Sequence, residues 1–179
     1  VLAKVIASLH DDTGRITVPG FYDGVPELSN ALAASWDDLN FDAEAFLGEV
    51  GLKIPAGEQG RRPLEMIWSR PTCEVNGMTA GYTGDGFKTV LPAQASAKIS
   101  FRLVGTQDPH AIRESFRKMV QDMIPADCRV EFHSHGASAA GQMSTDHPAF
   151  TQARSALSDE WPQAAAYVGC GGSIPIAAY

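Results

Sequence analysis

Cysteine is scarce in this sequence, and the three cysteines lie far apart: Cys73, Cys128 and Cys170. An odd number of distant cysteines matches neither a disulfide framework nor a paired C-x-x-C zinc motif. Chains without such a framework are typical of reducing compartments, so we expect a cytoplasmic protein.

Long hydrophobic runs are also missing. No apolar stretch approaches the roughly 18 residues that a membrane-spanning helix needs. The first residues, VLAKVIASLHDD, lack the basic region and the small-residue cleavage site of a secretory signal. We therefore expect no membrane partner.

Positive charge is in short supply. Lysine and arginine number 14 against 21 aspartates and glutamates, which gives a net charge of −7. An acidic surface repels phosphate backbones, so we expect no nucleic-acid partner. The 179 residues, 44% hydrophobic and 20% charged, suit one folded domain or a domain with an appended piece.

Both ends of the chain are abrupt. Val1, Val5 and Leu9 have helical spacing, yet no capping residue precedes them. The last residues, GGSIPIAAY, form a strand-like run without a polar tail. We interpret both ends as cuts through a larger protein.

Regular patterns appear along most of the chain. Residues 93–104 alternate apolar and polar side chains and predict a strand. Asp108 and Pro109 are typical of a helix start, and the helix they predict runs to Pro125. Further short helices are expected at 27–35, 42–50 and 64–68 and a long one from 146, with strand-like segments at 15–19, from 72, at 128–134 and at 165–169. This order predicts an α+β fold: a ferredoxin-like, open, four-stranded antiparallel sheet with helices on one face, plus a short helical insertion.

Catalytic motifs are hard to find. Of the five histidines, only His133 and His135 lie close in sequence, and no ligand set for a two-metal site accompanies them. Gly172 and Ser173 do not belong to a G-x-S-x-G nucleophile motif. Cys170 could act as a nucleophile if a histidine approached it, although a small residue in a tight turn is the more common role.

Anion recognition remains as a possible activity. Arg102 lies on the polar face of the strand at 93–104, and a guanidinium on a rigid strand can bind a carboxylate through two parallel hydrogen bonds. Gly172 and Ser173 could add backbone N–H groups and a hydroxyl. The alternative is an ordinary solvated sheet face, and the spacing does not separate the two.

Residues 70–109 closely resemble the lid domain of a family of dinuclear zinc metallopeptidases. This family includes aminoacylase, carnosine dipeptidase, acetylornithine deacetylase and succinyl-diaminopimelate desuccinylase. The motifs KTVLP (88–92), SFRLV (100–104), HSHG (133–136) and GGSIPI (171–176) follow in the same order. The added helical stretch at 27–67 makes the chain more similar to the dipeptidase branch.

The resemblance implies roles for particular residues. Arg102 would bind the C-terminal carboxylate of a small peptide or N-acyl amino acid, helped by Gly172 and Ser173. Thr89 and His135 would also contact the substrate or transition state. The family's metal ligands and general base have no counterpart here, so we expect no catalytic residue and no metal ligand in this chain, and two zinc ions in the parent enzyme.

The resemblance also implies an assembly. The lid would pair two subunits into a homodimer, and one lid would help to complete its partner's active site. In these terms residues 1–26 are the first helix and strand of the lid, 27–69 the helical insertion and 70–169 the main β-α-β lid and dimerisation domain. Residues 170–179 begin the return into the catalytic domain.

Two other functions stay open from the residues alone. The chain could be a small hydrolase that uses Cys170 or a metal at His133 and His135. It could also be a stand-alone module that binds amino acids or peptides through Arg102. The resemblance itself leaves one further alternative, the lid of an N-acyl amino acid deacylase.

Overall fold

A computed structural model describes residues 1–170 of the chain. The order of elements is a short helix α1 (Leu2–Ala7), three helices, a β-hairpin and two longer helices. Both helices and strands are present, so the predicted α+β class is confirmed. None of the helices among these residues is long and apolar enough to cross a membrane.

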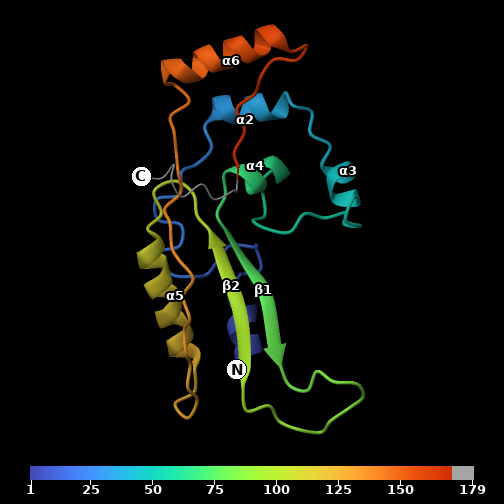
Figure 1. The fold of residues 1–179 in the computed structure, drawn as a ribbon, viewed down its shortest axis with the longest axis vertical. Coiled ribbons are helices and arrows are strands. Elements are labelled where there is room, and N and C mark those ends of the chain that lie inside the picture. Colours follow the sequence, from blue (N-terminus) through green and yellow to red (C-terminus); the bar gives the residue numbers. More distant parts are fainter. Residues whose placement is uncertain (171–179) are drawn as a thin grey trace.

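The β-hairpin is the central element of the fold (Figure 1). Strand β1 (Thr72–Ala80) pairs antiparallel with β2 (Ala95–Arg102), with Thr72 opposite Arg102 and Ala80 opposite Ala95. The register shifts between Val75 and Gly77, where β1 carries one extra residue. The alternation predicted for residues 93–104 is therefore a real strand, and residues 81–94 form the loop at the end of the hairpin.

Helix α5 (Pro109–Met123) covers one face of the hairpin, and it begins where the sequence predicts. The carboxylate of Asp108 accepts hydrogen bonds from the backbone N–H groups of His110 and Ala111, at 2.8 and 3.2 Å. These bonds satisfy two of the backbone donors that a helix start leaves without an intrahelical partner. Ile112 and Val120 are the buried residues of the predicted apolar stripe.

The hydrophobic core lies between α5, the hairpin and the first 22 residues. Its aromatic rings follow one another, with centroids 5.5 Å apart for Phe21 and Phe101 and 5.4 Å for Phe101 and Phe116. The first pair is tilted and the second edge-on, and aromatic contacts at this spacing stabilise a core beyond the area that they bury. The buried members are Leu9, Ile16, Val18, Phe21, Cys73 and Ile112.

The four-stranded arrangement is not found in residues 1–170, which hold a two-stranded sheet. The expected strand at 15–19 makes only an isolated bridge between Ile16 and His10. Residues 128–134 and 165–169 form no strand. A strand needs a neighbour for its backbone groups, and residues 132–136 instead contact α5. There Arg117 donates to Ser134 at 2.8 Å, and the ring of Phe116 lies 6.4 Å from that of Phe132.

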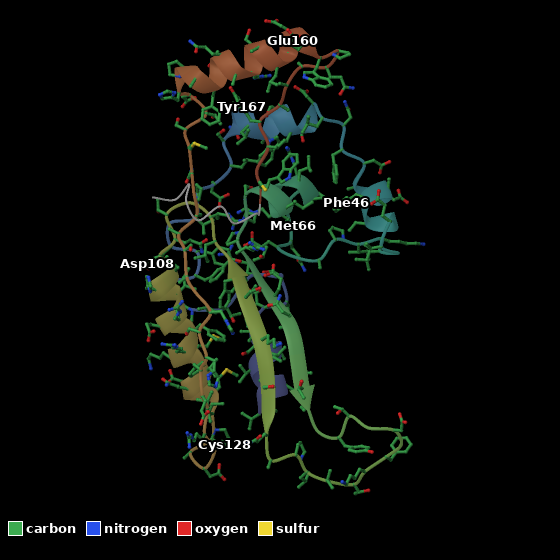
Figure 2. All side chains as sticks on the ribbon, in the orientation of Figure 1. Phe46, Met66, Asp108, Cys128, Glu160 and Tyr167 are labelled. Atoms are coloured by element: carbon green, nitrogen blue, oxygen red, sulfur yellow. The ribbon has the colours of Figure 1, made fainter. Side chains whose placement is uncertain are left out.

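Helices gather at one end of the hairpin, away from the loop at 81–94 (Figures 1 and 2). Residues 27–69 contain α2 (Asn30–Asp37), α3 (Ala43–Gly48) and α4 (Pro63–Trp68), close to the three helices that the sequence predicts there. Asp42 caps α3 as expected. Helix α6 (Pro148–Glu160) follows later in the chain and buries none of its residues.

The side chain of Trp36 links α2 to Tyr167, which lies far along the chain. The indole N–H of Trp36 donates to the carbonyl of Tyr167 at 2.8 Å, and its ring packs edge-on against Trp68 of α4. Buried tryptophan usually finds such an acceptor, because its N–H would otherwise lose its hydrogen bond to water. The aromatic pair and an ion pair between Arg62, which precedes α4, and Asp37 of α2 therefore hold these two helices together.

Candidate functional site

Arg102 is the last residue of β2 and is exposed. Because side chains alternate across a strand, it points away from the core face that carries Phe101. Thr72 lies directly opposite it, and the buried hydroxyl of Thr72 has no hydrogen-bond partner within residues 1–170. The structure thus places Arg102 at the end of a paired strand, where the sequence predicts it on the polar face.

Thr89 lies far from Arg102 along the hairpin. It belongs to the exposed loop at 81–94, which follows β1 and precedes β2 (Figure 1). The eight residues of β2 span about 25 Å at roughly 3.3 Å each. Arg102 ends that strand and Thr89 precedes its start, so one copy of the chain does not bring the two side chains together.

His135 is exposed and lies beside α5. Its neighbours in sequence are held by that helix: Arg117 donates to the hydroxyl of Ser134, and Arg113 donates to the carbonyl of Gly136 at 2.6 Å. His135 is therefore attached to the same helix that packs on the hairpin.

The remaining predicted site residues add no metal or nucleophilic centre that the structure describes. His133 is exposed and lies 4.0 Å from a carboxylate oxygen of Glu131. Within residues 1–170, no three histidine, cysteine, aspartate or glutamate side chains are grouped so that they could hold a metal ion. Cys170 is exposed. Gly172 and Ser173 lie outside the described residues.

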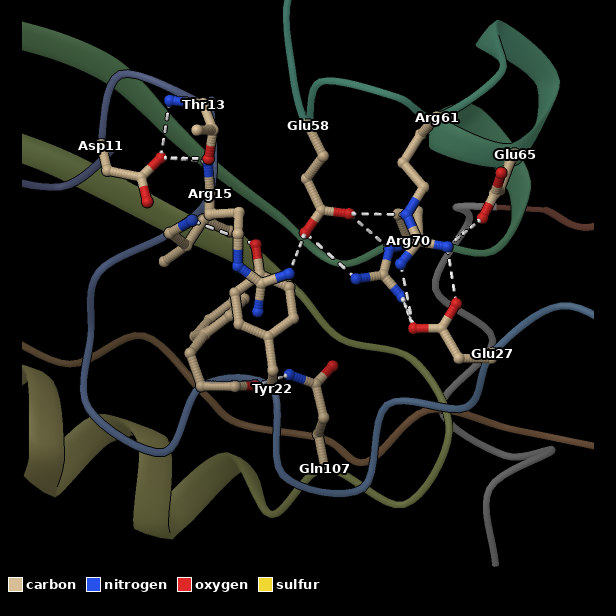
Figure 3. A network of polar contacts seen from close by, with 12 residues as sticks. Asp11, Thr13, Arg15, Tyr22, Glu27, Glu58, Arg61, Glu65, Arg70 and Gln107 are labelled. Carbon is tan, nitrogen blue, oxygen red and sulfur yellow. Dashed lines mark hydrogen bonds and ion pairs between the residues drawn. The ribbon is translucent and has the colours of Figure 1, made fainter.

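A buried ionic network is the main polar feature that sequence reasoning missed (Figure 3). Arg70 donates from Nε and Nη2 to the two carboxylate oxygens of Glu58, at 2.5 and 3.0 Å, and the two side chains are only 4% and 7% exposed. Arg61 binds both oxygens of Glu27 and also contacts Glu65 at 2.8 Å. Two-pronged charge-assisted bonds of this kind are the strong ones in proteins.

Burial and the neighbouring positive charges have opposite effects on the pKa of Glu58. Burial raises the pKa of its carboxyl group, but the hydrogen bonds from Arg70 and Tyr22 and the nearby Arg15 lower it, and the result lies below the usual range. Arg15 also lies over the ring of Tyr22, 3.9 Å from its centroid. Burial, with Glu58 nearby, raises the pKa of Tyr22 to about 12. Glu58 is therefore ionised and Tyr22 protonated at neutral pH.

The network ties together segments that are distant in sequence. Arg15 precedes the insertion, Glu58 lies within it, and Arg70 leads into β1. Nothing in the local sequence indicates these pairings, because no periodic pattern connects residues so far apart. The three arginines and three glutamates neutralise one another, so the network is suited to holding the fold and not to binding an ion from solution.

Comparison with known proteins gives the chain its context. Over 98% of the chain, it is 28% identical to the Cys-Gly metallodipeptidase DUG1 of Candida albicans. Over 69% of the chain, it is 25% identical to the Beta-Ala-His dipeptidase of Mus musculus. The chain spans 37% and 28% of the lengths of these two curated relatives.

Solved structures share the fold. The M20 family metallo-carboxypeptidase Sso-CP2 of Sulfolobus solfataricus superposes with a TM-score of 0.82 and 30% identity, over 98% of this chain and 40% of that one. The dipeptidase Dug1p of Saccharomyces cerevisiae does so with a TM-score of 0.73 and 26% identity, over 98% and 37%. The sequence model of the M20 peptidase dimerisation domain matches residues 1–132. The resemblance seen in the sequence is thereby confirmed, and the chain belongs to the M20 peptidase dimerisation domain family.

Proposed function

We propose that this chain is the lid and dimerisation part of a cytoplasmic, zinc-dependent dipeptidase that hydrolyses amide bonds of substrates with a free carboxylate. The observation that carries this proposal is the family match over residues 1–132, together with relatives that are metallodipeptidases. N-acyl amino acids are the alternative substrate class. The two classes differ in the group on the far side of the scissile amide, and no residue that we can place contacts that group.

Arg102 is the residue on which the proposed substrate binding depends. A guanidinium offers a planar pair of N–H donors that matches the two oxygens of a carboxylate. Its position at the end of a paired strand limits the freedom that it would lose on binding. Arg102 would thus orient the substrate, with His135 of the same chain and Gly172 and Ser173 as further contacts.

The metal belongs elsewhere in this proposal. Residues 1–170 offer no cluster of metal ligands, so the described side chains do not fit the two zinc ions of the proposed enzyme. The proposal therefore gives this chain no catalytic step, and we expect the chain alone to hydrolyse no amide bond. Its contribution would be to position the substrate and to pair two subunits.

The separation of Thr89 from Arg102 supports a dimer. A dipeptide is much shorter than the roughly 25 Å that β2 spans, so it cannot touch both residues of one copy. Two copies related by a two-fold axis can supply Arg102 from one chain and Thr89 from the other. The proposed homodimer would thus build each substrate site from two lids.

The proposed sheet has four strands in the complete enzyme. Residues 128–134 have no strand partner in the part of the chain that the structure describes, and β2 is hydrogen-bonded to β1 along one side. One more strand between β2 and residues 128–134 would pair with both and would produce the ferredoxin-like arrangement.

Replacing Arg102 tests the proposed binding role. In the complete enzyme we expect Arg102→Ala to lower kcat/KM for dipeptides by roughly 10- to 150-fold, since a charge-assisted pair is worth about 1.5–3 kcal/mol. Steady-state kinetics on a dipeptide and on its C-terminal amide measures the effect. The amide should lose little, because it has no carboxylate for Arg102 to bind.

Lys98→Ala is the matched control, because Lys98 is an exposed cation on the same face of β2. It should leave kcat/KM nearly unchanged. An Arg102→Ala enzyme with unaltered kcat/KM for the dipeptide would remove Arg102 from the site. Comparison of a dipeptide with an N-acetyl amino acid in the same assay would decide between the two substrate classes.

A further inference from the structure

Arg102 lies at one end of the β-hairpin. Thr72 begins β1 directly opposite it, and within residues 1–170 β1 is the strand that pairs with β2. A two-stranded pair by itself is only marginally stable, and the ends of an element open more easily than its middle. The direction of the Arg102 side chain therefore depends on the contacts that keep this end of the hairpin closed.

Arg70 holds the start of β1. It precedes Thr72 by two residues, so the two Cα atoms are at most about 7 Å apart, and Pro71 between them has a fixed φ. The guanidinium of Arg70 donates to both carboxylate oxygens of Glu58 and lies 5.4 Å from the ring centre of Tyr22 (Figure 3). A carboxylate and an aromatic ring thus hold the side chain that leads into the partner strand of Arg102.

Gln107 holds the chain just after β2. Its side chain is buried, with a relative exposure of 2% for the residue. Its carbonyl oxygen accepts a hydrogen bond from the backbone N–H of Val104 at 2.7 Å, and its amide group donates to the carbonyl of Phe21. Val104 follows Arg102 by two residues, so this contact fixes the chain where β2 ends. Loss of the Gln107 side chain would leave buried backbone groups without partners.

Both contacts attach the hairpin to the same short segment. Phe21 accepts the hydrogen bond from Gln107, and the next residue, Tyr22, contacts Arg70. This segment is itself fixed, because Phe21 is buried in the core and the hydroxyl of Tyr22 accepts from the backbone N–H of Ile16 at 3.0 Å. The two strands that meet at Arg102 are therefore held against one buried segment from both sides.

We infer that Arg70 and Gln107 are positioning residues, which fix the direction of Arg102 for a substrate carboxylate. This inference rests on the proposed function. Each side chain is bonded within the protein and acts through Arg102, not on the substrate. A small displacement is enough to matter, because an error of about 1 Å in the position of a binding group can lower a rate roughly 100-fold.

Steady-state kinetics of the complete enzyme tests this role. Arg70→Lys keeps the charge but loses the two-pronged bond, and Gln107→Met keeps the volume but loses both hydrogen bonds. The measured quantity is the ratio of kcat/KM for a dipeptide to kcat/KM for its C-terminal amide. We expect each variant to lower this ratio by roughly 3- to 10-fold, and neither to lower it further in an Arg102→Ala background.

Arg62→Lys is the matched control, because Arg62 contacts both carboxylate oxygens of Asp37 but is more than half exposed and is not bonded to the hairpin. It should leave the ratio unchanged. An unchanged ratio in Arg102→Ala itself would contradict the proposed function. If Arg102→Ala lowers the ratio, an unchanged ratio in Arg70→Lys or Gln107→Met would remove that residue from the positioning role. A further fall in the double variants would do the same, because the residue would then act without Arg102.

Hydrogen exchange of the purified chain gives a second readout that does not depend on activity. In both variants we expect the backbone amides of residues 99–102 to exchange at least about threefold faster, while those of residues 95–97, at the other end of β2, keep their wild-type rates. Equal acceleration at both ends would show a general loss of stability and would overturn the inference. The two variants change different contacts, so if one does not fold, the other still decides.

Discussion

Glu58 and Arg70 are oppositely charged residues whose side chains are buried against each other. The two side chains share two hydrogen bonds, and Arg15 and Tyr22 add further contacts to Glu58. The buried Nη1 of Arg70 has no hydrogen-bond partner among the described residues. Removing one partner of such a pair leaves an uncompensated buried charge. The pair is therefore the most sensitive polar contact among the described residues for a single substitution.

We expect Glu58→Gln to destabilise the chain by about 3–5 kcal/mol. Urea denaturation measures this, and Asp37→Asn is the control. Asp37 pairs with Arg62 at 2.7 Å, but both side chains are more than half exposed, so its loss should cost about 0–1 kcal/mol. Equal effects of the two substitutions would contradict the importance of burial.

The same carboxylate makes stability depend on pH. The pKa of Glu58 is lowered in the fold, so its contribution is present above the ordinary glutamate pKa of about 4.5 and is lost as the pH falls through the folded value. The free energy of unfolding of the wild type should therefore fall below about pH 4.5. In the Glu58→Gln variant, the free energy of unfolding should depend less on pH in this range.

Helix α5 is the element whose sequence and structure agree best. Its cap, its proline and its apolar stripe all lie within one continuous segment, so local chemistry defines it. The hydrogen bonds from Ala111 and His110 lower the pKa of Asp108, which shows that they favour the charged cap.

Asp108→Ala should lower the melting temperature of the chain, because two backbone N–H groups lose their acceptor. Thermal denaturation followed by circular dichroism measures the change. Asp108→Asn should recover most of the stability, since asparagine also caps helices. Full stability in the alanine variant would show that the cap contributes nothing.

The predicted strand at 128–134 shows why element prediction is less secure for strands. Its sequence alternates as a strand should, but a strand exists only when another segment pairs with it. In the described chain its neighbour is α5, through Phe116 and Arg117. The helix needs no such partner, because its hydrogen bonds are internal.

At the scale of the whole molecule, the insertion is held against the N-terminal segment by a close backbone approach. Gly14 has φ of +77°, and a Cβ there would lie 1.9 Å from the carbonyl oxygen of Gly57. Nearby, the side chain and backbone N–H groups of Gln59 donate to the carbonyls of Asp12 and Thr13. The ionic network continues the same junction.

Gly14→Ala should therefore open this junction. Gly51→Ala is the control, because Gly51 has φ of +76° and a Cβ there would have no neighbouring atom within 4 Å. Both variants incur the backbone cost of a positive φ, roughly 1–2 kcal/mol. The Gly14 variant should lose about 1–3 kcal/mol more, and limited proteolysis should cut residues 28–54 faster. Equal urea midpoints of unfolding for the two variants would contradict the importance of the close approach at Gly14.

The sequence by itself determined whatever is encoded within a few neighbouring residues. This includes the cap and stripe of α5, the alternation of β2 that places Arg102 on its polar face, and the motifs that identify the family. Helical spacing, capping and alternation are local properties, so a reader of the chain can follow them without coordinates.

Only the tertiary structure decided which distant segments meet. It paired Glu58 with Arg70 and Arg61 with Glu27, and it placed the loop that holds Thr89 at the opposite end of β2 from Arg102. It also left residues 128–134 against α5 in place of a strand partner. The reason is physical: the free energy of a buried ion pair or a strand pairing depends on both partners and on their burial, and neither is specified by the residues adjacent in sequence.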